Sequence, residues 1–184
     1  RNARAVVRRD HLKTSVDDID LESVEQVFFI THNPLMPPVA RLSNEQAAVA
    51  FTLGESIETS AGDPSFAGEA IRVVGTNPFI IDSQGEESNR FPNLITDFDV
   101  GCYAINTGSV ATDNPADIGV KDTVAILESV ARNSIQWTYD DTLDLTVPTD
   151  VPGIDIEQFN VPNRVEEFQT AQAELRKERL TYLD

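Results

Sequence analysis

Arg41 is the residue whose surroundings best suit chemistry on an anion. It lies in the run MPPVARLS at residues 36–43, where two prolines precede the arginine and a serine follows it. Proline fixes its own φ and restricts the residue before it, so we expect a stiff loop that leads into a helix. A guanidinium on a stiff backbone binds phosphate or carboxylate with little entropy loss. The alternative is an ion pair with a surface carboxylate, and the spacing alone favours that alternative.

Other residue types that often carry chemistry lack suitable partners in this sequence. His11 and His32 are 21 positions apart and belong to no HxH or HxxxH pattern, so we expect no zinc site. Cys102 lies in an apolar run and is interpreted as a packing residue. The acidic clusters at residues 17–20 and 140–141 do not fit an EF-hand loop. We therefore expect no metal ligands in this chain.

The charge of the chain restricts its partners. Its 184 residues include 31 Asp and Glu against 14 Lys and Arg, a net charge of −17. Binding to nucleic acid or to an anionic membrane surface needs basic residues, so we expect neither partner. The apolar runs are too short for a membrane-spanning helix. The excess of carboxylates favours a salt-adapted, halophilic protein over an ordinary acidic one. A single cysteine agrees with a reducing, cytoplasmic location.

Strand-like segments are spread along the whole chain. Residues 24–31 (VEQVFFIT) are nearly all apolar or β-branched, which is typical of a strand buried on both faces. The run CYAIN at residues 102–106 predicts a second buried strand. Weaker patterns predict short strands at residues 5–7, 71–74 and 78–81.

Helix signals alternate with these strands. Ser43 with Gln46 forms a capping-box pattern before an apolar run that ends at Gly54. Asp122 is the predicted N-cap of another helix, with an apolar stripe of Val124, Leu127, Val130 and Ala131. A further helix is predicted over residues 86–97, with Pro92 in its first turns. Another is predicted over residues 164–183. The alternation indicates an α/β fold of mixed layers without a regular βαβ order.

Several short motifs occur in an order that resembles the ATP-dependent phosphoenolpyruvate carboxykinases. The segment PPVARLS at residues 37–43 is similar to the family's PPVSRLT, and Ala61-Gly62 to its glycine-containing loop. Four further segments resemble the family's FGxPF, NTG, IKDT and IPTELPGVD elements, in that order: residues 75–79 (GTNPF), 106–108 (NTG), 120–123 (VKDT) and 147–155 (VPTDVPGID). Residues 2–4 resemble an upstream NTR element, so the resemblance covers nearly the whole chain.

The resemblance implies a cytoplasmic lyase of gluconeogenesis. Such an enzyme decarboxylates oxaloacetate and uses ATP with Mg²⁺ or Mn²⁺ to form phosphoenolpyruvate. By this resemblance residues 1–184 are the carboxyl-terminal portion of its catalytic, ATP-binding domain. Arg41 would be the catalytic residue that contacts nucleotide phosphate and substrate. Ile118, through its backbone, and Thr123 would contact the adenine end of ATP.

The sequence also departs from the family's pattern. Asp117 stands where the family usually has arginine. An acidic side chain there would weaken nucleotide binding unless another arginine, such as Arg72 or Arg132, compensates for it. No phosphate-binding loop of the type GxxxxGK[ST] occurs, and the family's metal ligands precede the region that matches. Residue 1 is arginine and no signal peptide is visible, so we expect a processed chain or a piece of a longer one. We expect this chain to be inactive without the upstream part. The alternative is a non-catalytic nucleotide-binding or subunit-interaction module, or a gene remnant.

Overall fold

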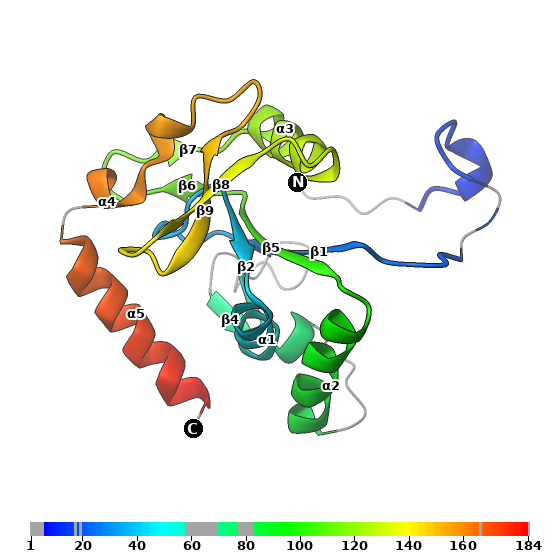
Figure 1. The fold of residues 1–184 in the computed structure, drawn as a ribbon, viewed down its shortest axis with the longest axis horizontal. Coiled ribbons are helices and arrows are strands. Elements are labelled where there is room, and N and C mark those ends of the chain that lie inside the picture. The colour runs from blue at the N-terminus through cyan, green and yellow to red at the C-terminus, as the bar shows by residue number, and fades with distance from the viewer. Residues whose placement is uncertain are drawn as a thin grey trace.

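A five-stranded mixed sheet forms the centre of the molecule (Figure 1). The computed structural model describes residues 6–16, 18, 20–57, 70–76, 83–165 and 167–183. The strand order is β1-β5-β2-β9-β8. The strands are β1 (Gln26–Thr31), β2 (Val39–Leu42), β5 (Gly101–Asn106), β8 (Gln136–Asp140) and β9 (Leu145–Asp150). The pair β1–β5 is parallel and the other pairs are antiparallel.

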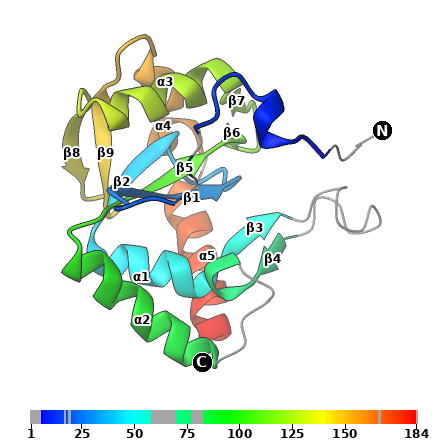
Figure 2. The same cartoon turned by 90° about the vertical axis from the view of Figure 1, so that its right-hand side faces the viewer.

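Helices cover both faces of this sheet (Figure 2). On one face, α3 (Val120–Ala131) packs Ile126 and Val130 against Val39 and Ile105 of the sheet. On the other, α1 (Asn44–Leu53) and α2 (Gln84–Asp97) surround Cys102. Because successive residues of a strand face opposite sides, one strand can serve both cores. The arrangement confirms the predicted mixed α/β layers.

Smaller elements surround the sheet. The hairpin β6–β7 (Ser109–Val110 and Ala116–Asp117) lies beside the short helix α4 (Val161–Arg164). A third buried cluster joins this end of the molecule to α5 (Phe168–Leu183). Its buried members are Val110, Ile118, Leu143, Phe159, Val161 and Phe168. A second hairpin pairs β3 (Glu55–Ile57) with β4 (Ala70–Arg72), and three short 3-10 helices span Arg9–His11, Val74–Thr76 and Ile156–Phe159.

The predicted start and end of α1 are confirmed. The Ser43 hydroxyl accepts a hydrogen bond from the Gln46 N–H, and the Gln46 side chain accepts one from the Ser43 N–H. Gly54 ends the helix with φ at +51°, and a Cβ there would collide with the Val73 carbonyl at 1.6 Å. Only glycine fits this backbone position without rearrangement.

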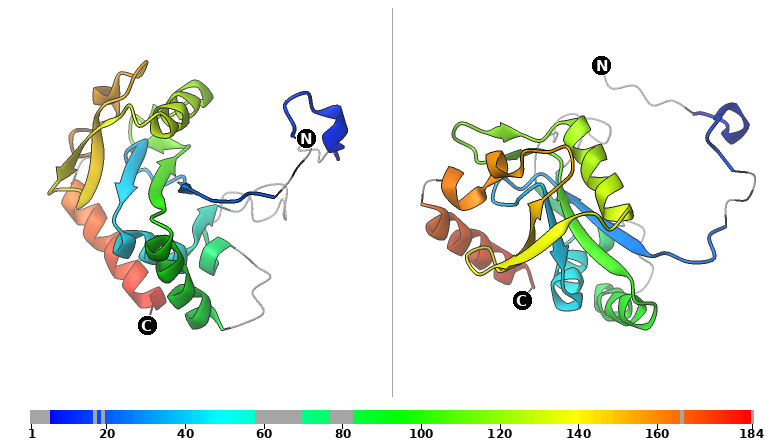
Figure 3. Two further views of the ribbon diagram at one scale, coloured as in Figure 1. Left: turned by 45° about the vertical axis from the view of Figure 1, so that its right-hand side comes forward. Right: turned by 45° about the horizontal axis from the view of Figure 1, so that its top comes forward.

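The strand predicted over residues 24–31 forms, but it is not buried on both faces. It is β1, which lies at one end of the sheet order, and Ile30 is 62% exposed. The shorter run predicted at residues 5–7 is also wrong where the structure describes it, because Val6 and Val7 are exposed and irregular. Figure 3 shows the segment before β1 extending away from the sheet.

The predicted cap and apolar stripe of α3 are corrected by the structure. Gly119 is the N-cap, and Asp122, at the third helical position, accepts a hydrogen bond from the Gly119 N–H at 2.9 Å. Val124 and Leu127 are 48% and 37% exposed, whereas Ile126 is fully buried. The apolar pattern alone fitted two faces of the helix, and the sheet selects the face that carries Ile126 and Val130.

The other helix predictions are displaced by a few residues. Ser83 caps α2, which begins two residues earlier than predicted, so Pro92 lies in its interior instead of its first turns. The closing helix begins at Phe168, after the separate α4, and not at residue 164. The strand predicted at 71–74 is β4, which ends at Arg72, while the one at 78–81 lies outside the described residues. None of the described helices combines the length and apolar character that crossing a bilayer requires.

An ion-pair cluster fixes α5 to the β3–β4 hairpin. Arg179 of α5 donates to both carboxylate oxygens of Glu55, at 2.9 and 2.5 Å. Arg72 of β4 donates to Glu55 at 3.3 Å and to Glu178 at 2.7 Å. Burial raises the pKa of the Glu55 carboxyl, but the hydrogen bonds and charges of Arg179 and Arg72 outweigh it and hold that pKa below its ordinary value.

This cluster predicts a pH-dependent contribution to stability. Glu55→Gln should lower the free energy of unfolding by about 1–3 kcal/mol near neutral pH, since it leaves two partly buried arginines without their shared carboxylate. Because the folded pKa of Glu55 is depressed, the contribution is complete above about pH 5 and is lost as the pH falls through the folded value. Urea unfolding at several pH values measures this.

Glu128→Gln is the matched control for that experiment. Glu128 pairs with Arg132 at 3.9 Å on an exposed helix face, where an ion pair contributes little. Equal destabilisation by the two variants, or a difference between wild type and Glu55→Gln that does not shrink as the pH is lowered, would contradict the assignment.

Candidate functional site

The side chain of Asn106 is fully buried at the end of β5 and binds several backbone groups at once. Its Nδ2 group donates toward the carbonyls of Asn33, Met36 and Ser109 at 2.9, 3.0 and 3.1 Å. Its Oδ1 accepts from the Gly108 N–H at 3.0 Å. This amide therefore ties the loop before β2 to the turn after β5. The sequence offered the NTG pattern as a resemblance only, and the structural role of its asparagine was missed.

The loop before β2 is held on both sides of its prolines. The Asn33 side chain accepts from the Leu35 N–H at 2.9 Å, and the Met36 N–H donates to the Asn33 carbonyl at 3.0 Å. Pro37 and Pro38 are buried. The Pro38 carbonyl accepts from the Asn106 N–H at 3.0 Å, so the backbone enters the sheet at this residue.

Arg41 consequently lies on strand β2 and not, as the sequence indicated, in the loop. It is directly opposite Tyr103 of β5 on one side and Thr146 of β9 on the other. The register places the three side chains on one face of the sheet. Because β2 pairs on both sides, its backbone is more constrained than that of a loop.

The guanidinium of Arg41 is exposed and has no protein partner among the described residues. No carboxylate lies within ion-pair distance of it, and its side chain takes part in no hydrogen bond there. The surface ion pair that the spacing favoured is therefore not formed with any residue the structure describes. An unpaired, exposed guanidinium on a paired strand is chemically suited to bind an anionic ligand.

Ile118 and Thr123 lie close together in the chain, at the start of α3. The side chain of Ile118 is buried in the cluster with Val110, and its N–H donates to the Gly108 carbonyl at 2.9 Å. Both the N–H and the hydroxyl of Thr123 donate to the Gly119 carbonyl, at 3.0 and 3.2 Å. Asp117 is exposed on β7. A contact between Ile118 and a ligand would therefore come from its backbone, and a contact of the Thr123 side chain would come from its hydroxyl.

The sheet face that carries Arg41 is the face that α3 covers. Val39, two residues before Arg41, packs against Ile126 and Val130 of α3. Arg41 and the helix that carries Thr123 are thus on the same side of the sheet. Arg72 and Arg132, which could compensate for Asp117, are paired with glutamates elsewhere.

The remaining candidates for chemistry have structural explanations. Cys102 is buried in the core beneath α1 and α2, and burial raises the pKa of its thiol, as expected for a packing residue. Among the residues that the structure describes, no group of three or more His, Cys, Asp or Glu side chains is arranged to hold a metal ion.

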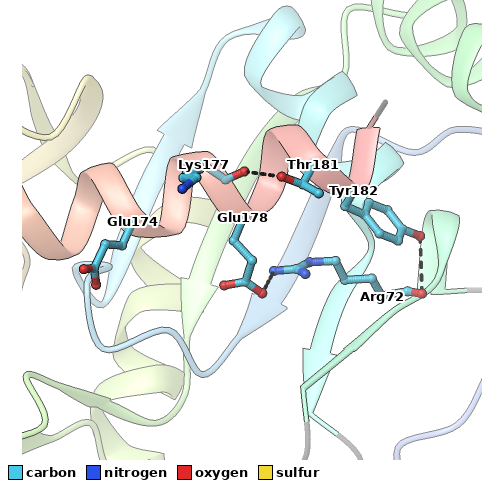
Figure 4. A pocket seen from close by; sticks show the side chains of 6 residues that line it. All are labelled: Arg72, Glu174, Lys177, Glu178, Thr181 and Tyr182. Atoms are coloured by element: carbon cyan, nitrogen blue, oxygen red, sulfur yellow. Dashed lines mark hydrogen bonds and ion pairs between the residues drawn. The ribbon is translucent and has the colours of Figure 1, made fainter.

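Among the described residues, the surface also has cavities that lie away from Arg41, Ile118 and Thr123. One of about 420 Å³ lies between α5 and the β3–β4 hairpin, where Glu178 and Tyr182 turn toward Arg72 (Figure 4). Another of about 410 Å³ is lined by polar side chains near α4, including Asp113, Asn160 and Arg164. Neither cavity is lined by Arg41, Ile118 or Thr123.

Comparison with known proteins gives consistent matches to one family. The model of the family described as phosphoenolpyruvate carboxykinase, in its ATP-dependent form, matches residues 1–157. A phosphoenolpyruvate carboxykinase (ATP) from Aeropyrum pernix is 30% identical over 164 residues, which cover 87% of this chain. Those from Parvibaculum lavamentivorans and Brucella anthropi are 31% and 30% identical over 68% and 66% of it.

The matched length is short relative to those proteins. The alignments cover 32%, 25% and 24% of the three relatives, so this chain spans about a third of their length or less. Helix α5 lies beyond the residues that the family model matches.

The buried amide of Asn106 generates a direct test. Asn106→Asp keeps the shape of the side chain but turns a carboxylate toward three carbonyl oxygens, so we expect it to lower the free energy of unfolding by about 2–4 kcal/mol. Asn93→Asp, at an exposed position of α2, is the control and should change it by less than about 0.5 kcal/mol. Urea denaturation compares them, and similar midpoints would show that Asn106 does not hold this loop.

Proposed function

Because the chain belongs to the family of ATP-dependent phosphoenolpyruvate carboxykinases, we propose that it is part of an enzyme that acts on oxaloacetate and ATP. The products would be phosphoenolpyruvate, carbon dioxide and ADP, and the enzyme would serve gluconeogenesis in the cytoplasm. The names of the relatives support the chemistry. This chain matches only 32% and 25% of the length of two of these relatives. The activity is therefore proposed for an enzyme that also contains the part of a carboxykinase that this chain does not span.

The observation that carries this proposal is the unpaired guanidinium of Arg41. In a chain with 31 carboxylates, an exposed arginine without an acidic partner among the described residues can accept an external anion. We propose that Arg41 is the catalytic residue that contacts ATP phosphate and substrate. Charge builds on the oxygens of the transferred phosphoryl group, and a guanidinium that binds these oxygens stabilises that charge.

The adenine end of ATP is proposed to lie near the start of α3. Because the side chain of Ile118 is buried, its contact with ATP would come from the backbone. The Thr123 hydroxyl donates to Gly119 and can still accept a hydrogen bond from an amino group. Both residues lie within one turn of the α3 N-terminus.

The divalent cation that the family uses with ATP finds no ligand set among the described residues. Mg²⁺ or Mn²⁺ would neutralise phosphate charge when bound. We propose that its ligands, like the phosphate-binding loop, belong to the part of the enzyme outside this chain.

Arg41→Ala is the test of the proposed function. The polypeptide encoded by the complete gene should form phosphoenolpyruvate from oxaloacetate, ATP and Mn²⁺ at high salt. We expect Arg41→Ala to lower kcat/KM by about 10²–10³, or roughly 3–4 kcal/mol of transition-state stabilisation. Arg90→Ala, which changes an exposed arginine of α2, should retain full activity.

Two outcomes would contradict this proposal. An inactive gene product would remove the carboxykinase assignment, and wild-type turnover by Arg41→Ala would remove Arg41 from the reaction. The 184-residue chain alone should be inactive in the same assay.

A non-catalytic nucleotide-binding or subunit-interaction module is the second candidate, and the acidic Asp117 favours it. A phosphate-binding loop upstream in the same reading frame would support the enzyme.

Asp117 gives a separate prediction about ATP affinity. An acidic group near bound nucleotide repels phosphate, whereas arginine attracts it. We expect Asp117→Arg in the gene product to tighten ATP binding about 3–10-fold, and Asp117→Asn to give a smaller gain by removing the charge alone. Isothermal titration calorimetry measures both, and unchanged affinity in the two variants would place the nucleotide away from β7.

A further inference from the structure

Strand β1 forms one edge of the central sheet, and among the described residues no strand pairs with its outer side. It pairs with β5 alone, in parallel. The carbonyls of Glu25 and Thr31, at the two ends of this pairing, accept hydrogen bonds from N–H groups of the β5 segment at 2.9 and 3.0 Å. Because alternate residues of a strand turn their backbone groups to the same side, Gln26, Phe28 and Ile30 direct their N–H and C=O groups away from β5.

The side chains of β1 offer no protection against pairing at this edge. Proteins usually prevent unwanted pairing of an edge strand by placing charged residues or proline in it. The six residues of β1, QVFFIT, include neither, and Ile30 is 62% exposed. The strand at the opposite edge, β8, ends instead with a charged residue, Asp140. A six-residue strand without charge, proline or glycine pairs readily with a further strand.

The segment that leads into β1 is uncovered as well. It extends away from the sheet (Figure 3), and the aliphatic side chains of Val16, Leu21 and Val24 are 70%, 81% and 51% exposed. None of the three belongs to a buried cluster in the part of the chain that the structure describes. Exposed apolar side chains next to an open strand edge indicate a surface that another folded body covers.

The similarity to carboxykinases indicates which body this is. The family model covers residues 1–157, so it includes both the uncovered segment and β1. The alignment with the Aeropyrum pernix protein spans only 32% of that relative, so a carboxykinase of that length has ample further chain to cover this edge. A second copy of this chain is a less favourable occupant, since two bodies that each carry a charge of −17 repel one another.

We propose that a strand from the part of the carboxykinase outside this chain pairs with the outer edge of β1, and that the same part covers the segment before it. The added strand bonds to the outward backbone groups of Gln26, Phe28 and Ile30, in the manner of β-strand addition. The pairing explains why an edge strand has the apolar sequence that is typical of an internal one. This inference rests on the proposed function, because it takes the chain as part of a larger carboxykinase.

Backbone amide exchange tests the pairing directly. Mass spectrometry with residue-level fragmentation compares the complete gene product with the 184-residue chain, the latter at a concentration where light scattering shows a monomer. In the chain we expect slow exchange at Val27 and Phe29, which face β5, and fast exchange at Phe28 and Ile30. In the gene product Phe28 and Ile30 should exchange at least about 100-fold more slowly, so that the alternation disappears.

Ile30→Lys tests the same edge through stability. The change should lower the Tm of the gene product by at least about 3 °C, because the added strand and its surroundings bury the new charge. It should hardly alter the Tm of the 184-residue chain, in which this position is exposed. Thr138→Lys, at an exposed position of the opposite edge strand β8, is the matched control and should leave both values unchanged. Failure of the gene product alone to fold with Ile30→Lys would support the pairing equally.

Several outcomes would overturn the inference. Alternating exchange that persists in the gene product would show that no strand is added, and equal losses of stability in the gene product and the chain would place the effect of Ile30→Lys within the chain itself. Slow exchange at Phe28 in a dimer of the 184-residue chain would make a second copy the occupant. A gene product without further carboxykinase sequence would remove the proposed occupant.

The exchange experiment needs no catalysis, so it separates this inference from the proposed activity. Slow exchange at Phe28 and Ile30 in a gene product that forms no phosphoenolpyruvate would refute the activity and support the pairing. An active gene product in which these two amides exchange as fast as in the 184-residue chain would do the reverse.

Discussion

The buried amide of Asn106 is the interaction on which the candidate site depends. A primary amide has two donor hydrogens and one acceptor oxygen, and here they serve three carbonyls and one N–H from two separate loops. An unpaired buried amide would cost more than the hydrogen bonds contribute when they are made, so this position has few workable substitutes. Since β5 pairs with both β1 and β2, the contact fixes the loop between those two strands at the end of their shared neighbour.

The sheet register explains how Arg41 can lack an acidic partner among the described residues of so acidic a chain. The residues opposite Arg41 in the register are Tyr103 and Thr146, not carboxylates. Other arginines behave differently: Arg72 and Arg179 share Glu55, and Arg132 pairs with Glu128. Within the described ranges, Arg41 thus has no carboxylate partner, because the sheet register places Tyr103 and Thr146 beside it. A net charge of −17 continues to argue against nucleic acid as the ligand.

Local sequence signals predicted the parts of the fold that local physics determines. The capping box at Ser43, the left-handed Gly54 and the strand ending at Asn106 follow from residues close in sequence. Long-range contacts decided the rest. Which face of α3 is buried depends on the sheet beneath it, and a strand as apolar as β1 was expected to be covered on both sides. The placement of Arg41 on a strand was missed because two prolines locally favour a loop, while pairing with β5 and β9 favours extension. The role of Asn106 in holding two loops had no local signal beyond its position before Thr107-Gly108.

The most direct measurement is an experimental structure of the complete gene product with ATP or pyrophosphate bound. The account predicts phosphoryl oxygens within about 3 Å of the Arg41 guanidinium, as a bidentate contact from strand β2. An Arg41 side chain paired with a protein carboxylate, with the anion bound elsewhere, would contradict it.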